Sequence, residues 1–189
     1  WSLGQAGLII KNAAGELLAI DPYLSDAIEK NHPDSEFKRN FPPVLPPSAL
    51  NICDAVFITH FHDDHLDLST LLPLAERAPT LPIWLPAPDV SLLPVANARA
   101  ARTGQHIEVG RFSVLPIAAA HSDYQRDAQG NDRVLGYFIR CGEVSLGHSG
   151  DTLGTPELLD QMKSRRPEHN GLRSNGGAEG RAEAGHKPN

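Results

Sequence analysis

The run HFHDDH at residues 60–65 is the feature that most constrains this chain, because it places potential metal ligands directly after an apolar segment. The preceding run Ala55–Thr59 is rich in β-branched and aromatic residues and predicts a strand. A strand end is rigid, and the loop that follows it can fold its side chains around an ion. Imidazole suits zinc and its neighbours, and carboxylate extends the choice to manganese or iron.

The spacing within this run predicts how its ligands are shared. His60 and His62 lie two residues apart, so an extended chain points both side chains the same way. Asp64 continues that parity and His65 breaks it, which predicts a turn that carries both toward a second ion. Asp63 is expected to face water or to orient a ligand from behind. The alternative is a polar loop with solvated histidines, which this spacing behind a strand disfavours.

Hydrophobic runs and turn residues predict the rest of the secondary structure. Hairpins are expected from Leu8–Ile10 with Leu17–Ile20, from His106–Val109 with Phe112–Ile117, and from Val134–Arg140 with Glu143–Leu146. Helices are expected at Leu68–Arg77 with an interruption near Pro73, at Val90–Ala101 with Asp89 as N-cap, and at Thr155–Ser164. Residues 82–85 are expected to form a short strand. The proline-rich residues 22–50 are expected to be irregular, and either flank the site or strap the surface.

The pattern His-x-His-x-Asp-His after a strand resembles the signature of the metallo-β-lactamase superfamily. Further runs resemble its branch that contains L-ascorbate-6-phosphate lactonase: WSLGQAGLII at 1–10, AIDPYLSD at 19–26 and GHSGDT at 147–152. The resemblance extends over about residues 1–167, which we expect to form one domain. It implies an α/β fold, an αββα sandwich with metals at one edge between the two sheets.

Two more ligands are expected at later strand ends. His121 follows a predicted strand and three alanines, whose small side chains permit close packing near a site. Gly150 permits a sharp bend before Asp151. The resemblance implies one ion held by His60, His62 and His121, a second held by Asp64 and His65, and Asp151 as the bridge between them.

The resemblance also implies the chemistry. Two divalent ions, zinc or manganese with iron as a further option, would make a bridging water a hydroxide and polarise the substrate. Asp64 would orient the hydroxide or pass a proton to the leaving group. An acidic residue in place of His62 would point toward the diiron redox relatives, so the histidine favours hydrolysis.

Two further candidates keep alternatives open. Asp21 matches an acid that can accept the N–H of a ligand imidazole, or is a turn residue before Pro22. His148 either supports the site or contacts substrate, or is bonded within its own turn. Arg126 and Arg133 are candidates for an anion contact, with solvated loop charges as the favoured alternative. His32, His106, His169 and His186 lack a ligand-like context and are expected at the surface.

Composition excludes some classes of function. The net charge of -6 and the lack of a basic patch argue against a nucleic-acid partner. No apolar run is long enough to cross a bilayer, and the two cysteines are too few for a disulfide framework. A cytoplasmic protein is the expectation, with a small-molecule substrate such as a phosphorylated sugar lactone. The sequence leaves the oligomeric state open.

The end of the chain departs from the resemblance. Relatives carry one more histidine for the second ion on a later strand, and residues 168–189 offer no counterpart. This stretch lacks periodicity and is expected to be a disordered tail. A truncated or frame-shifted reading frame is expected, or a short form that recruits the ligand from another chain. The predicted function is a metal-dependent hydrolase of a lactone, ester or phosphoester. The alternatives are a phosphodiesterase or nuclease of the same superfamily and a catalytically impaired metal-binding fragment.

Overall fold

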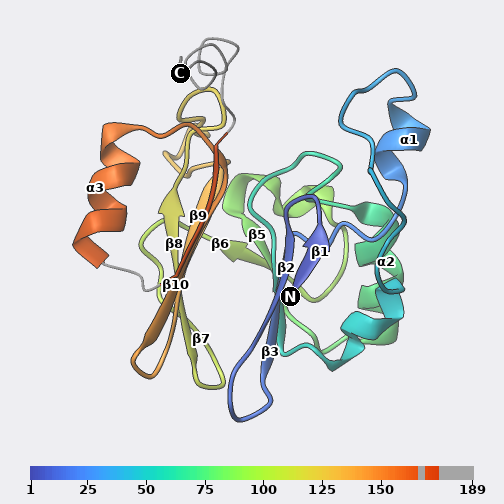
Figure 1. Ribbon diagram of the computed structural model, residues 1–189, viewed down its shortest axis with the longest axis horizontal. Helices are drawn as coiled ribbons and strands as arrows, with labels where there is room; N and C mark the ends of the chain where they lie inside the picture. The colour runs from blue at the N-terminus through green and yellow to red at the C-terminus, as the bar shows by residue number, and fades with distance from the viewer. Residues whose placement is uncertain (166–168, 175–189) are drawn as a thin grey trace, which may run out of the picture.

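A computed structural model describes residues 1–165 and 169–174, which form two β-sheets with helices on their outer sides (Figure 1). The first sheet has the strand order β1-β2-β3-β4-β5-β6. Its strands are β1 (Ser2–Gly4), β2 (Gly7–Lys11), β3 (Leu17–Ile20), β4 (Ala55–Phe57), β5 (Ile83–Pro86) and β6 (Ala98–Ala101). The second sheet has the order β11-β10-β9-β8-β7. Its strands are β7 (Ile107–Val109), β8 (Phe112–Ala118), β9 (Leu135–Cys141), β10 (Val144–Thr152) and β11 (His169–Ser174).

The helices complete a sandwich of four layers. In Figure 1, α3 (Pro156–Arg165) lies outside the second sheet, and α1 (Ala27–Asn31) and α2 (Leu68–Arg77) lie on the opposite side of the molecule. Two 3-10 helices, η1 (Pro47–Ile52) and η2 (Ala87–Leu92), join the strands of the first sheet. The predicted αββα sandwich is therefore confirmed. Among the described residues, no helix has the length and apolar character that crossing a membrane requires.

The main core lies between the two sheets. Ile20 and Phe57 of the first sheet pack with Phe112, Val114 and Tyr137 of the second, and all five side chains are buried. Burying each such side chain stabilises the fold by about 1.5–3 kcal/mol. A second cluster packs α2 and η1 against the outer face of the first sheet. The sandwich is thus held rigidly up to the ends of its strands.

All three predicted hairpins are confirmed. β2 pairs antiparallel with β3, β7 with β8, and β9 with β10. The turns that join them use glycines with positive φ: Gly15, Gly110 and Gly142. The alternating patterns and turn glycines therefore predicted these pairs correctly because a hairpin is a local structure.

The predicted helix from Val90 to Ala101 is wrong. The chain forms η2 and then β6, which pairs in parallel with β5. Pro94 lies in the middle of the predicted helix, where it would remove a backbone hydrogen bond. Asp89 therefore caps no such helix, and its buried carboxylate instead accepts a hydrogen bond from Arg133.

Helix α2 has the predicted bounds, but Pro73 does not interrupt it. Asp67 caps its start by accepting hydrogen bonds from the backbone N–H groups of Ser69 and Thr70. Leu71 and Leu74 are buried in the outer core cluster. Capping and packing therefore outweigh the single backbone hydrogen bond that Pro73 removes.

Two segments differ in part from their predictions. Residues 22–50 are mainly irregular as expected, yet they include α1 and the start of η1. Residues 169–174, which lie in the segment predicted to be a disordered tail, form β11 and pair in parallel with β10. Residues 168 and 175–189, including His186, lie outside the described part of the chain. The boundary at residue 167 stays a prediction.

Candidate metal centre

The strand ends of both sheets meet at one edge of the sandwich. Within the first sheet, β3 ends beside Asp21 and β4 leads into the loop at residues 58–65. Two hydrogen bonds join the sheets here: the Leu135 N–H donates to the Thr59 carbonyl at 2.9 Å, and the Tyr137 hydroxyl donates to the Ile58 carbonyl at 2.6 Å. The loop that carries the histidines therefore starts from a point fixed by both sheets.

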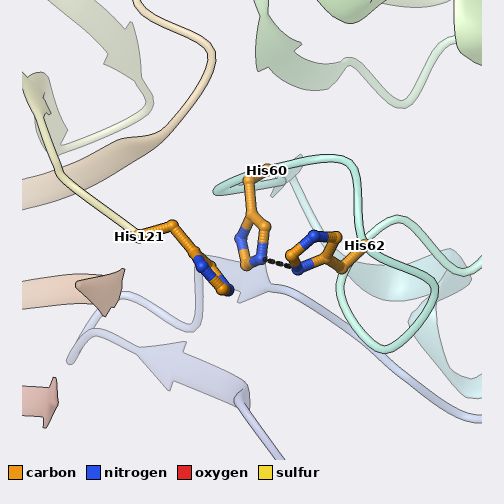
Figure 2. A group of neighbouring side chains, drawn as sticks. All are labelled: His60, His62 and His121. Carbon is orange, nitrogen blue, oxygen red and sulfur yellow. Dashed lines mark hydrogen bonds between the residues drawn. The ribbon is translucent and has the colours of Figure 1, made fainter. Parts of the chain in front are cut away.

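Three histidines from two separate loops converge at this edge. Ligand atoms of His60, His62 and His121 all lie within 4.8 Å of one another. Figure 2 shows His121 reaching the other two rings from its own loop. Nε2 of His60 lies 2.9 Å from Nδ1 of His62. Two nitrogens that bind one tetrahedral zinc ion lie about 3.3 Å apart, given bonds of about 2.05 Å, so the pair needs little movement to share a cation.

Burial keeps the imidazoles of His60 and His62 neutral, as metal binding requires. Loss of solvent, with the neighbouring imidazoles of His65 and His62, lowers the pKa of His60 far below its ordinary value. Burial and the nearby His121 lower the pKa of His62 as well. Each ring therefore offers a lone pair rather than a positive charge near pH 7.

His65 and Asp151 form a second group of ligand atoms with His60, again within 4.8 Å. His65 is fully buried, and its Nε2 lies 3.5 Å from Oδ2 of Asp151 and 3.8 Å from Oδ2 of Asp64. This nitrogen has no hydrogen-bond partner among the described residues. A buried nitrogen that faces two carboxylates without a hydrogen bond is a suitable place for a cation.

The charge around His65 supports the same interpretation. Burial disfavours the charged ring, but the carboxylates of Asp21, Asp151 and Asp64 outweigh burial and raise the pKa of His65 to about 10. Positive charge is therefore stabilised at this position, whether it is carried by a proton or by a metal ion.

Asp21 fixes the far side of the His65 ring. Its Oδ2 lies 2.8 Å from Nδ1 of His65, and its Oδ1 accepts a hydrogen bond of 2.7 Å from the Thr59 N–H. Burial raises the pKa of Asp21, but His65, His148 and the Thr59 hydroxyl outweigh it, so the net shift is downward. The Asp21 backbone has a φ of 43°, in the left-handed region that aspartate tolerates.

Gly150 and Asp151 lie at an irregularity in β10. The register of β10 with β11 shifts between His148 and Asp151, and Gly150 has a φ of 60°. A Cβ at Gly150 would lie 2.9 Å from the Leu135 carbonyl oxygen and 3.0 Å from Cβ of Thr59. The bend therefore brings β10 against the start of the loop at residues 58–65. Asp151 is the next residue along β10 and lies at this point of close approach.

His148 is held within its own turn, and the residue before His121 is tied to β10. Nδ1 of His148 accepts a hydrogen bond of 3.2 Å from the Gly150 N–H, and the ring is buried beside Asp21. The predicted bond within the turn is thus present. The residue before His121 is tied to β10, since the Ala120 N–H donates to the Thr152 hydroxyl at 3.0 Å.

Asp63 contacts residues outside both groups of ligand atoms. Its Oδ2 accepts a hydrogen bond of 3.0 Å from the Asn31 side chain and lies 3.3 Å from Nε2 of His32. Asp67, just beyond the loop, accepts a hydrogen bond of 2.8 Å from the Ser25 hydroxyl. These contacts attach the segment at residues 22–50 to the loop at residues 58–65 and to the start of α2. They agree with the prediction that this segment flanks the site.

The sequence analysis overlooked Thr59 and Asp67, which are both fully buried. Thr59 is the first polar residue after an apolar strand, and Asp67 is the N-cap of α2. The two candidate anion contacts are engaged elsewhere: Arg126 pairs with Asp132 at 2.8 Å and Arg133 pairs with Asp89. These ion pairs therefore favour the interpretation of Arg126 and Arg133 as loop charges over a role in binding an anion.

Comparison with known proteins identifies related sequences and folds. The pattern that defines the beta-lactamase superfamily domain matches residues 18–167. A UPF0173 metal-dependent hydrolase of Cupriavidus necator is 28% identical over 186 aligned residues, which cover 85% of this chain and 58% of that protein. The chain thus spans somewhat more than half the length of this relative.

Solved structures show the same architecture. An isothiocyanate hydrolase from Delia radicum gut bacteria has a TM-score of 0.66 at 23% identity, and covers 89% of this chain and 68% of its own. A possible metal-dependent hydrolase from Veillonella parvula has a TM-score of 0.68 at 18% identity, and covers 88% and 68%. These similarities establish a shared fold.

Proposed function

The chain belongs to the family of beta-lactamase superfamily domains, and we propose that it is a metal-dependent hydrolase. The observation that carries this proposal is the convergence of two groups of ligand atoms at one strand edge: His60, His62 and His121, and His60, His65 and Asp151. The curated relative from Cupriavidus necator, named a metal-dependent hydrolase, supports the same activity.

The proposed ligands fit divalent cations by their chemistry. His60, His62 and His121 would hold one ion, and Asp64, His65 and Asp151 would hold a second. Zinc and manganese suit this mixture of imidazole and carboxylate, with iron as a further option. Bound ions would supply Lewis-acid polarisation of the substrate and an activated water. Nε2 of the buried His65, which faces two carboxylates without a hydrogen bond, is the feature that supports a second ion.

Asp64 is the proposed proton carrier. Its side chain is 20% exposed, so it can meet both solvent and a bound substrate, whereas the neighbouring His65 is fully buried. Its Oδ2 can orient the attacking water, accept a proton from it and pass that proton to the leaving oxygen. In a lactone that oxygen stays tethered to the product, and ring opening requires the proton.

The proposed substrate is a small molecule with a lactone, ester or phosphoester bond, such as a phosphorylated sugar lactone. The lactonase-like runs at residues 1–10, 19–26 and 147–152 support the lactone. A nucleic-acid substrate has less support, because the net charge is -6 and Arg126 and Arg133 are paired with acids. Cys53 and Cys141 are free thiols, which supports the proposed cytoplasmic location.

A substrate panel tests this function. The full chain, loaded in turn with zinc and manganese, is assayed on a generic ester, a set of lactones and bis-p-nitrophenyl phosphate. We expect turnover of an ester or lactone that a chelator removes and that metal restores, because the proposed ligands supply no nucleophile of their own. Preferential turnover of the phosphodiester would support the phosphodiesterase alternative. Stoichiometric metal binding without turnover of any substrate would support the impaired fragment and contradict the proposal.

A further inference from the structure

We propose that the Thr59 hydroxyl is a positioning group shared by both halves of the site, because it sets which ring nitrogen of His60 carries the proton and bonds the Asp21 carboxylate that holds His65. This inference rests on the proposed metal-dependent function. It assigns a role to a residue that lies outside both groups of ligand atoms.

The hydroxyl lies at the centre of a buried cluster. Thr59 Oγ1 is 2.7 Å from Oδ2 of Asp21, 3.0 Å from Nδ1 of His60 and 3.2 Å from Nδ1 of His65. The exposed fraction of all four residues is 0%. Solvent therefore does not compete for these bonds, and each polar atom depends on its partners within the cluster.

The supply of hydrogens decides the direction of each bond. A hydroxyl has one hydrogen to donate, and an ionised carboxylate can only accept. At 2.7 Å the Thr59 hydrogen must lie between Oγ1 and the Asp21 oxygen, because two sets of lone pairs would otherwise face each other. Oγ1 is then an acceptor toward His60, so Nδ1 of His60 must donate to it. Nδ1 of His65, at 2.8 Å from the same Asp21 oxygen, must donate as well.

The consequence is that Nε2 of His60 carries a lone pair directed into the site, while Nε2 of His65 is the ring nitrogen left facing the site. Nε2 of His60 faces Nδ1 of His62, and Nε2 of His65 faces the carboxylates of Asp151 and Asp64. One hydroxyl therefore orients a ligand of each proposed ion, His60 directly and His65 through Asp21. Such outer partners typically contribute about 10–100-fold to metal affinity.

The methyl group of Thr59 has a separate packing role. A Cβ at Gly150 would lie 3.2 Å from Cγ2 of Thr59, so β10 passes directly over this side chain. Thr59→Val keeps the shape and removes the hydroxyl. Thr59→Ser keeps the hydroxyl and removes the methyl group. The two variants therefore separate hydrogen bonding from packing.

The test compares the wild-type chain, Thr59→Val and Thr59→Ser. Zinc affinity is measured by competition with a chromophoric chelator, and the imidazole tautomers by long-range 1H–15N NMR with and without zinc. We expect Thr59→Val to lose about 10–100-fold in zinc affinity and to show His60 as a mixture of tautomers without zinc. Thr59→Ser should keep the proton on Nδ1 and bind zinc close to wild type.

The outcomes distinguish this inference from the proposed function. A wild-type chain that binds no zinc contradicts the function itself. Zinc binding by wild type, with equal affinity and unchanged tautomers in Thr59→Val, overturns only the role of Thr59. Should the valine variant not fold, the wild-type spectrum decides: a proton on Nε2 of His60 without zinc contradicts the proposal, and a proton on Nδ1 supports it.

Discussion

Replacement of His60 with alanine is expected to abolish metal-dependent hydrolysis. His60 is the residue common to both groups of converging ligand atoms, so its loss removes a ligand from one proposed ion and a neighbour from the other. The fall in kcat/KM should exceed the roughly 100-fold effect typical of a supporting residue. Steady-state kinetics with zinc, together with the zinc content of the dialysed protein, measure the effect.

The matched control is His106→Ala, which removes an exposed histidine that lies outside both groups. It should leave kinetics and zinc content unchanged. Because His60 is fully buried, His60→Gln is added as a variant that leaves a smaller cavity, and thermal unfolding shows whether each variant is folded. Undiminished turnover in a folded His60 variant would remove the basis for the assigned site.

Replacement of Gly150 with alanine is expected to destabilise the fold and to weaken metal binding together. The new Cβ would meet the Leu135 carbonyl oxygen at 2.9 Å and Cβ of Thr59 at 3.0 Å, and the backbone has a φ of 60°. We expect a loss of about 2–5 kcal/mol in the free energy of unfolding, from left-handed strain and overpacking combined. Denaturant unfolding measures this loss of free energy. Zinc titration measures the weaker metal binding that a displaced Asp151 would cause.

Gly142→Ala is the control that separates these two causes. Gly142 has nearly the same backbone angle, with a φ of 61°, but nothing lies within 4 Å of a Cβ built there. It should lose only about 1–2 kcal/mol from strain and should bind zinc as the wild type does. Equal losses in the two variants would show that the close approach of β10 to Thr59 has no energetic weight.

Local patterns predicted much of the fold and singled out the residues whose side chains converge at the strand edge. The hairpins, α2 and the strand before His60 follow from alternation, turn glycines and caps, which involve residues close in sequence. His121 and Asp151 come from distant segments, and their approach to His60 follows from the parallel direction of β8 and β10 and from the bonds that join the two sheets.

The features that the sequence did not predict depend on contacts between distant segments. β6 forms beside β5 although its residues lie within a helical pattern, because parallel pairing with a buried strand outweighs propensity. The role of Thr59 depends on the position of Asp21, which lies 38 residues earlier in the chain. β11 gains its order from pairing with β10 rather than from its own composition.

Zinc-edge anomalous diffraction from crystals of the full chain grown with zinc tests the central claim most directly. The predicted result is a peak bound by His60, His62 and His121 at about 2.0–2.1 Å from each nitrogen, with a second peak beside His65 and Asp151. Zinc located elsewhere, or no peak at these three histidines at saturating zinc, would contradict the assignment of this strand edge as a metal centre.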